Sequence, residues 1–330
     1  MLSRTADHLY WMARYTERAE NTARMLDINY QMSLLPQSSE QAEQGWRGML
    51  GISELTGDYL RRHSGVNPRE VMDFMVRDES NPSSIHSCLR AARENARAVR
   101  GTLTTEVWET ANATWLEFKR LIAGGNFHKD PSEFFEWVKF RSHLSRGVTL
   151  GTMLQDESFH FLRIGTFLER ADNTARLLDV KFHALSPEFH GQQAQTLNGM
   201  RQAQALAREQ PEFDFYHWSA ILRSVSGFEV YRKVYRNVIR PEKVAELLIL
   251  RPDMPRSLAA CMNEVMINLK RVANEHSGET LRRAGRLHAD LQFGRIDEIL
   301  ATGLHAFLTQ FLDRVGDLGV GISRDFLVPV

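Results

Sequence analysis

The chain has 330 residues, of which 43% are hydrophobic and 25% are charged, the composition of a globular protein long enough to bury a core. Its 41 Lys and Arg residues balance its 41 Asp and Glu residues, so the overall charge does not favour nucleic acid or an anionic membrane as a partner. Two cysteines exclude a disulfide framework and cannot form a zinc site by themselves.

The first 35 residues predict one long amphipathic helix, with Ser3 as a candidate N-cap, Asp7 in the first turn and Pro36 as its stop. Its apolar side chains recur at steps of three and four, which places on one face Met12, Tyr15, Ala19, Thr22 and Leu26. A second long helix ending near Pro187 has the corresponding stripe Ile164, Phe167, Ala171, Thr174 and Leu178.

These two predicted helices contain nearly identical sequence segments. Residues 17–27 read ERAENTARMLD and residues 169–179 read ERADNTARLLD, with nine of eleven positions identical. Further pairs follow in the same order along the chain: Trp46 and Trp218, Pro68 and Pro241, Pro82-Ser83-Ser84-Ile85 and Pro255-Arg256-Ser257-Leu258, Cys88 and Cys261. A match of this kind indicates a tandem duplication. We therefore expect a first repeat over residues 1–150 and a second over residues 151–330, packed as one unit, with an exposed Gln-rich polar insertion at about residues 188–217.

Strand signals are nearly absent, since no stretch alternates apolar and polar residues and no Asn-Gly hairpin stands between such stretches. The sequence predicts an all-α protein with two helical bundles, each led by a long helix and related to the other by a pseudo-two-fold axis. The helices after the two long ones are expected to begin at Trp46 and Trp218, and the following ones at Pro68 and Pro241.

A row of polar residues runs along each long helix on the side opposite the apolar stripe. The residues of interest are Glu17, Arg18, Asn21 and Arg24 in the first and Glu169, Arg170, Asn173 and Arg176 in the second. Glu20 with Arg24, and Asp172 with Arg176, are ion pairs at spacing i, i+4. Three interpretations stay open: a solvated helix face, a surface that binds a ligand or partner, and buried ion pairs to other helices or across the repeat interface.

One predicted helix of the first half carries a basic stripe, formed by Arg90, Arg93, Arg97 and Arg100, with Glu94 among them. The planar donors of arginine suit a carboxylate or phosphate group. Arg93, Glu94 and Arg97 are therefore candidate binding residues for an acidic partner, although the stripe could instead pair with acidic neighbours such as Glu17 or Glu106. Without aromatic residues between the arginines, nucleic acid is not expected.

Sharper chemistries find little support. Glu157 and His160 have the spacing of a di-iron helix, but the matching places in the first half hold Thr5 and His8, so we expect no metal. Each histidine is instead expected to make one structural hydrogen bond. Cys88 and Cys261 lie within apolar helical patterns and are interpreted as packed small hydrophobes. No nucleotide-binding or hydrolase motif occurs, so no cofactor and no catalytic residue is assigned.

Four segments of the chain form long and specific motifs: residues 2–24, 81–85, 92–97 and 167–172. On these segments the chain resembles the bacterial alpha-E family over essentially its whole length, and the Glu-Arg motif of the family falls on Glu17-Arg18 and Glu169-Arg170. Members are all-helical and are typically encoded beside, or fused to, a circularly permuted ATP-grasp ligase. The resemblance implies a partner of such a ligase in a system that forms amide or peptide bonds.

The leading hypothesis is a non-catalytic accessory subunit that offers its Glu and Arg helix faces to the ligase, or to a small peptide or amino-acid substrate. Two alternatives remain: an enzyme that uses Glu17 and Glu169 as acid and base in a cleft between the repeats, and a purely structural helical scaffold. The N-terminus lacks the apolar run of a signal peptide and no stretch of eighteen apolar residues occurs, so we expect a cytoplasmic protein without a membrane span.

Overall fold

The computed structural model describes residues 1–35, 38–124, 126–185 and 211–327, and within these ranges it is all-helical, without a strand. The first half contains α1 (Ser3–Ser33), α2 (Ser39–Ile52), α3 (Thr56–Leu60), α4 (Pro68–Val76), α5 (Ile85–Ala98), α6 (Thr105–Ala123) and α7 (Pro131–Thr152). The second half contains α8 (Glu157–Leu185), α10 (Pro211–Ser224), α11 (Phe228–Tyr235), α12 (Pro241–Ile249), α13 (Leu258–Arg271), α14 (Gly278–Gln292), α15 (Ile296–Thr302) and α16 (Leu304–Phe326).

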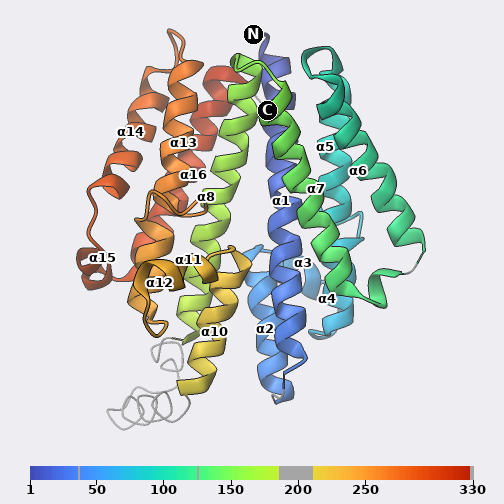
Figure 1. Ribbon diagram of the computed structural model, residues 1–330, viewed down its shortest axis with the longest axis vertical. Helices are drawn as coiled ribbons and strands as arrows, with labels where there is room; N and C mark the ends of the chain where they lie inside the picture. Colours follow the sequence, from blue (N-terminus) through green and yellow to red (C-terminus); the bar gives the residue numbers. More distant parts are fainter. Residues whose placement is uncertain (36–37, 125, 186–210, 328–330) are drawn as a thin grey trace.

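The two long helices α1 and α8 stand side by side in the middle of the molecule (Figure 1). α5 and α7 pack on α1, while α13 and α16 pack on α8, so each half surrounds its own long helix. Every residue of α1 from Ala19 to Asp27 is buried, polar ones included. The expectation of one apolar and one polar face is therefore too simple for α1, because a helix covered on several sides has no solvent face at its centre.

Gly165 allows α1 and α8 to approach closely. A Cβ atom at Gly165 would lie 2.4 Å from the backbone oxygen of Tyr10 and 3.2 Å from Cβ of Ala13. Since real side chains do not tolerate such distances, only glycine fits at this crossing. The close approach is what brings the polar residues one turn further along each helix within reach of the other.

Several predicted helix ends are confirmed and others are wrong. Pro68 and Pro241 are the first residues of α4 and α12, in keeping with the fixed φ of proline. α2 and α10, however, begin about seven residues before Trp46 and Trp218. Ser3 lies inside α1 rather than capping it: Leu2 is the N-cap residue and makes no side-chain hydrogen bond, and no acidic residue lies in the first turn. α7 continues through the proposed junction and ends at Thr152.

Equivalent contacts recur in the two halves. Ser84 caps α5 by accepting a hydrogen bond from the Ser87 amide at 3.1 Å, and Ser257 caps α13 by accepting one from the Ala260 amide at 3.0 Å. The buried Cys88 and Cys261 each point their thiol at the carbonyl of a proline six residues earlier. Both cysteines are packed hydrophobes as expected, and burial raises the pKa of each thiol to about 12.

Most of the polar insertion expected at residues 188–217 lies outside the described residues; its last part, from Pro211, is the start of α10. In the described ranges no helix combines the length and the apolar character that a membrane span requires.

Candidate functional site

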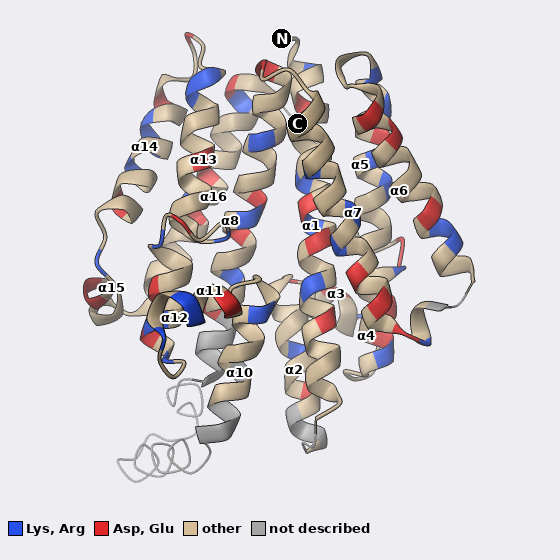
Figure 2. Cartoon of the chain, in the orientation of Figure 1, with Lys and Arg blue, Asp and Glu red and all other residues tan. Residues whose placement is uncertain are grey.

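Charged residues occur half-way along α1 and α8 (Figure 2). Those of α1 and α8 that carry the two Glu-Arg motifs include the buried Glu17, Glu169 and Arg170. The two Glu-Arg motifs bind each other there. Arg18 donates from Nε and Nη2 to the Glu169 carboxylate at 2.6 and 3.0 Å. Arg170 donates from Nε and Nη2 to the Glu17 carboxylate at 2.8 and 2.9 Å. Each motif thus contributes an arginine to the carboxylate of the other, in the two-pronged geometry that makes such pairs strong.

Further arginines reach the same carboxylates. Glu17 also accepts from Arg256 at 3.0 Å and from Arg146 at 3.1 Å, and Glu169 accepts from Arg14 at 2.7 Å. The Glu17 and Glu169 side chains are 1% and 6% exposed, so these ion pairs are shielded from solvent. Burial on this scale is tolerated only because every carboxylate oxygen is hydrogen-bonded to a guanidinium group.

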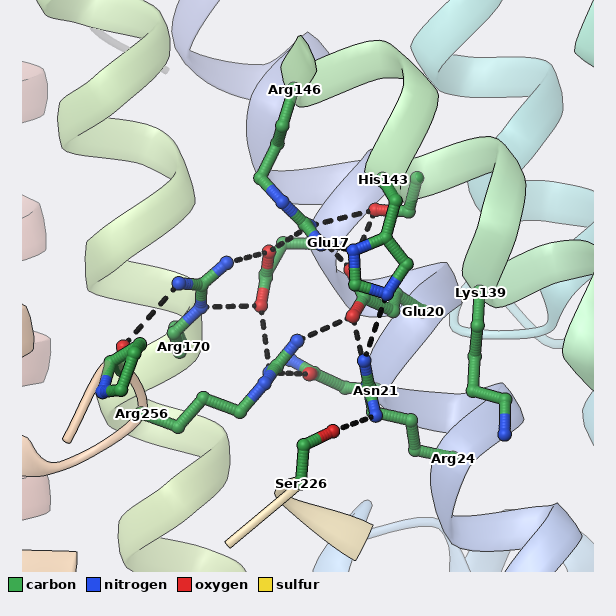
Figure 3. A network of polar contacts seen from close by, with 12 residues as sticks. Glu17, Glu20, Asn21, Arg24, Lys139, His143, Arg146, Arg170, Ser226 and Arg256 are labelled. Carbon is green, nitrogen blue, oxygen red and sulfur yellow. Dashed lines mark hydrogen bonds and ion pairs between the residues drawn. The ribbon is translucent and has the colours of Figure 1, made fainter. Parts of the chain in front are cut away.

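Glu20 extends the network on the side of α7 (Figure 3). Its fully buried carboxylate accepts from Arg24 Nε at 2.8 Å, from Ser142 Oγ at 2.6 Å and from Arg256 Nη2 at 2.5 Å, and Arg146 is a further partner. Arg256 lies in the loop before α13 and is 6% exposed. It therefore crosses from the second half of the chain to fill a site on α1.

The arginines decide the ionisation of the buried glutamates. Burial alone would raise the pKa of Glu169, but the charges of Arg14 and Arg18 outweigh it and lower that pKa to about 2. At Glu17 burial also acts to raise the pKa, but the charges of Arg170 and Arg256 outweigh it and lower the pKa. At Glu20 burial again acts to raise the pKa. The charges of Arg256, Arg146 and Arg24 nevertheless hold this pKa well below its usual range. All three glutamates are fixed anions at neutral pH.

A polar cavity of about 210 Å³ opens between the two long helices. It is lined from α1, from α8, from the end of α2 and from the loop before α5, and its polar lining comprises Arg18, Asn21, Thr22, Ser53, Glu54, Ser83, Glu169, Asp172, Asn173 and Arg176. Arg176 donates to Asp172 at 2.8 Å and also binds Glu54, whose side chain is 72% exposed at the rim. The cavity is thus the place where the motif residues of both long helices meet solvent-accessible space.

A family model described as a predicted alpha-helical domain with a conserved ER motif matches residues 1–327. The chain belongs to the Alpha-E family. In this Alpha-E chain the Glu-Arg motifs at residues 17–18 and 169–170 form reciprocal ion pairs at the centre of the bundle.

Curated relatives of this Alpha-E chain are longer than it is. Uncharacterised proteins of Mycobacterium bovis and of Mycobacterium tuberculosis strain CDC 1551 are each 24% identical over 338 aligned positions. A protein of Mycobacterium tuberculosis strain H37Rv is 23% identical. Each alignment covers 94% of this chain but 35% of the relative, so the chain spans about a third of the length of the curated relatives it matches. No solved structure matches the chain.

The structure brings together eight of the residues that the sequence singled out. Glu17, Arg18, Asn21, Arg24, Glu169, Arg170, Asn173 and Arg176 lie in the ion-pair network or line the cavity. Of the three interpretations of this row, Glu17, Arg170 and Glu169 fit that of buried ion pairs to another helix, since they pair between α1 and α8. The expected i, i+4 pairs of Arg24 and Arg176 are also present.

The basic stripe of α5 lies elsewhere. It pairs with acidic neighbours, as one interpretation had it, but these are Glu79 and Glu94 instead of Glu17 or Glu106. Arg90 binds Glu79, while Arg93 and Arg97 both bind Glu94. Arg93 further donates to Asn112 at 3.1 Å, and its guanidinium group lies 5.9 Å from the ring centre of Trp108. Trp108 on α6 supplies the aromatic neighbour that the stripe itself lacks.

Sequence reasoning missed Arg256 and Arg146 as partners of the network. The sequence did contain an indication of Arg256, because this arginine stands where the otherwise similar segment of the first half has Ser83. Arg146 had none, since nothing in the pattern of α7 says which helix faces it. His8 and His160 each place Nδ1 2.8 Å from an asparagine Oδ1, as the expectation of one structural hydrogen bond requires. In the described part of the chain, no set of three or more acidic, His or Cys side chains is grouped as metal ligands.

Proposed function

We propose that this chain is a cytoplasmic, non-catalytic subunit of a system that forms amide or peptide bonds, with a circularly permuted ATP-grasp ligase as its partner. The observation that carries the proposal is the length of the relatives: the region that aligns with this chain makes up 35% of each mycobacterial protein, and the rest is further sequence. A unit found joined to other sequence is suited to act together with another domain. The resemblance of the Glu-Arg segments to ligase-associated proteins names the kind of partner.

We further infer that residues 1–150 and 151–330 are tandem copies related by a pseudo-two-fold axis. Recurring contacts support this. Arg24 donates to Ser226 at 2.7 Å, and Arg176 binds Glu54 in the matching place of the other half. Ser226 and Glu54 both have positive φ, 53° and 56°, a conformation that is rare outside glycine. The reciprocal pairing of the two Glu-Arg motifs has the same two-fold character.

The electrostatics favour the subunit over an enzyme that uses Glu17 and Glu169 as acid and base. A general acid needs a pKa near the working pH, whereas neighbouring arginines hold both carboxyl groups ionised. These glutamates stabilise the contact between the two long helices. The polar cavity is the place in this fold suited to a small substrate, such as an amino acid or a small peptide, that the ligase would use.

The exposed stripe on α5 is the docking surface that we assign to the ligase. Arg90 and Arg97 have side chains 48% and 64% exposed, and each is held by a single glutamate. Arg93 is less exposed and packs near Trp108, so it supports the surface more than it forms it. Arginines with weakly bound acidic neighbours can exchange them for the carboxylates of a partner at small cost.

The test is purification of the tagged chain from its own cells, with mass spectrometry of the proteins that elute in stoichiometric amount. An ATP-grasp ligase is expected among them, and Arg97→Glu should reduce its recovery at least about tenfold. The matched control is Arg282→Glu, because Arg282 forms the same i, i+3 ion pair with Glu279 on α14. Elution of the chain without a ligase, or equal recovery with the two variants, would contradict the proposal.

A further inference from the structure

The two long helices each offer two carboxylates and one asparagine at equal spacing. In α1 these are Glu17, Glu20 and Asn21, and in α8 they are Glu169, Asp172 and Asn173. Each set presents two carboxylates and one amide, which are hydrogen-bond acceptors suited to a cation with several donors. The two sets differ in what occupies them.

In α1 the set holds a guanidinium group of the chain itself. Arg256 donates from Nη1 to Glu17 Oε1 at 3.0 Å and to Asn21 Oδ1 at 2.9 Å, and from Nη2 to Glu20 Oε1 at 2.5 Å (Figure 3). Its planar group thus engages all three members of the set at once. This is a built guanidinium site, with the ligand supplied by the loop before α13.

In α8 the same set lines the polar cavity. Glu169, Asp172 and Asn173 all face it, and so does Ser83, which stands where the matching words of the second half have Arg256. The short side chain of Ser83 leaves unfilled the kind of space that an arginine fills in the other half. In the part of the chain that the structure describes, no side-chain hydrogen bond engages Asn173, so its amide oxygen is available to a ligand.

We propose that this cavity binds a small molecule or peptide side chain that bears a guanidinium group, arginine being the simplest case, in the manner in which Arg256 occupies the matching site. The inference deepens the proposed function, on which it rests, by naming the substrate class that the cavity takes. Its test uses the isolated chain. The guanidinium proposal can therefore fail while a ligase still co-purifies, and the ligase proposal can fail while the isolated chain still binds arginine.

The charges around the two sites favour the cavity as a cation site. Apart from Arg256 itself, the α1 site has two carboxylates, those of Glu17 and Glu20. Three arginines lie against them: Arg24, Arg146 and Arg170. At the cavity the numbers are equal: Glu54, Glu169 and Asp172 against Arg14, Arg18 and Arg176. A guanidinium group therefore meets three carboxylates against three arginines at the cavity, whereas Arg256 meets two carboxylates against three arginines, so the net charge around the cavity is the less positive one. Burial lowers the pKa of Arg256 to about 10 against the opposing charges of Glu20 and Glu17, and Arg170 and Arg24 add to the lowering.

The cavity is also accessible from outside. Asp172, Arg176 and Glu54 have side chains 23%, 27% and 72% exposed, so the rim is formed by charged groups in contact with solvent. Glu169, at the other extreme, is buried. A ligand entering from the rim would exchange water for hydrogen bonds to ionised carboxylates, which are stronger than those to neutral groups.

The experiment is isothermal titration of the purified chain with L-arginine and with L-citrulline, which has nearly the same shape but no charge. Saturable arginine binding is expected with a dissociation constant below about 1 mM, and citrulline should bind at least about tenfold more weakly. Equal affinity for the two ligands, or no saturation by arginine up to about 10 mM, would overturn the proposal.

Two variants locate the site. Ser83→Arg supplies the missing side chain from within and should abolish arginine binding. Asp172→Asn keeps the shape of the cavity and should weaken arginine binding at least about tenfold, which keeps the test decisive if Ser83→Arg does not fold. Binding of arginine to a folded Ser83→Arg variant, or unchanged affinity with Asp172→Asn, would show that the cavity is not the site.

Discussion

The buried carboxylates are the residues on which this structure depends most. Glu17 and Glu20 lie against four arginines, and Glu169 lies against Arg14 and Arg18. Such groups are costly to remove from water, and the cost is offset only while each keeps its partners. A carboxylate held in this way is part of the architecture of the fold rather than a group free to exchange protons.

Glu17→Gln removes one charge, which leaves the buried Arg170 without a carboxylate and the buried Arg256 with that of Glu20 alone. We expect the free energy of unfolding to fall by about 3–5 kcal/mol, the usual cost of breaking one partner of a buried pair. The measurement is urea denaturation followed by circular dichroism.

The matched control is Glu279→Gln, at a carboxylate that also binds two arginines, Arg282 and Arg283, but lies on the surface of α14. Because solvent screens exposed pairs, its denaturation midpoint should equal that of the wild type. Equal midpoints for Glu17→Gln and wild type would mean that the buried pairs do not stabilise the fold.

The loss of stability at acidic pH should reflect the lowered pKa of Glu169. Its pKa is about 2 in the folded protein against an ordinary value of 4.5, so between these values the unfolded chain binds more protons than the folded one. Its contribution, on the order of 3 kcal/mol, is therefore complete above about pH 4.5 and is lost as the pH falls toward about 2.

Denaturation of wild type and Glu169→Gln across this range provides the test. The variant should start less stable near neutral pH and lose less stability on acidification, so the two curves converge at low pH. Curves that stay parallel from pH 6 to about pH 2 would argue against a depressed pKa at Glu169.

At the scale of the elements, the contact between α1 and α8 organises the bundle. It depends on Gly165, which faces the backbone of Tyr10, and on the small Ala13 beside it. Bringing two helix backbones this close aligns the Glu-Arg motifs so that each arginine reaches the opposite carboxylate. The reach of an arginine side chain is limited, so a small separation of the helices would break the paired geometry.

Gly165→Ala should destabilise the protein by about 1–3 kcal/mol, since the added methyl group forces the two helices apart. Thermal unfolding by calorimetry gives the measurement. Gly151→Ala on α7 is the control, because a Cβ there meets nothing within 4 Å, and alanine in place of an unconstrained helical glycine stabilises by about 0.5–1 kcal/mol. A Gly165→Ala variant as stable as Gly151→Ala would show that the crossing has room for a side chain.

At the scale of the whole molecule, the two halves complete each other. The carboxylates of α1 receive Arg170 and Arg256 from the second half, and Glu169 of α8 receives Arg14 and Arg18 from the first. Either half alone would leave buried charges without partners. The ion pairs therefore make the halves interdependent even though each surrounds its own long helix.

Residues 1–154 and 155–330, produced as separate chains divided in the loop between α7 and α8, should each lack cooperative unfolding and should co-elute in equal amounts when expressed together. Glu17→Gln in the first chain should weaken their association by more than about a hundredfold, the equivalent of the roughly 3–5 kcal/mol expected to be lost in the intact protein. Size-exclusion chromatography and titration calorimetry give both results. A cooperative, monomeric half would contradict the interdependence.

Much of the fold could be predicted from the sequence. The all-helical class, the two long helices and the starts of α4 and α12 follow from periodicity and proline, because these signals act within a few residues along the chain. The near-identical words at residues 17–27 and 169–179 also pointed to the residues that meet at the centre. Periodicity even gave the ion pair between Glu20 and Arg24, since its spacing is set by one helix alone.

The tertiary structure alone decided which partner each of the other charges has. The pattern of α1 placed its polar row opposite the apolar stripe but could not say that this side is covered by α7, by α8 and by a loop carrying Arg256. Nor could it say that α5 turns its arginines outward to Glu79 and Glu94. The reason is physical: helical spacing fixes how residues are arranged around one axis, whereas burial, ion pairing and the cavity beside Ser83 depend on how separate axes pack.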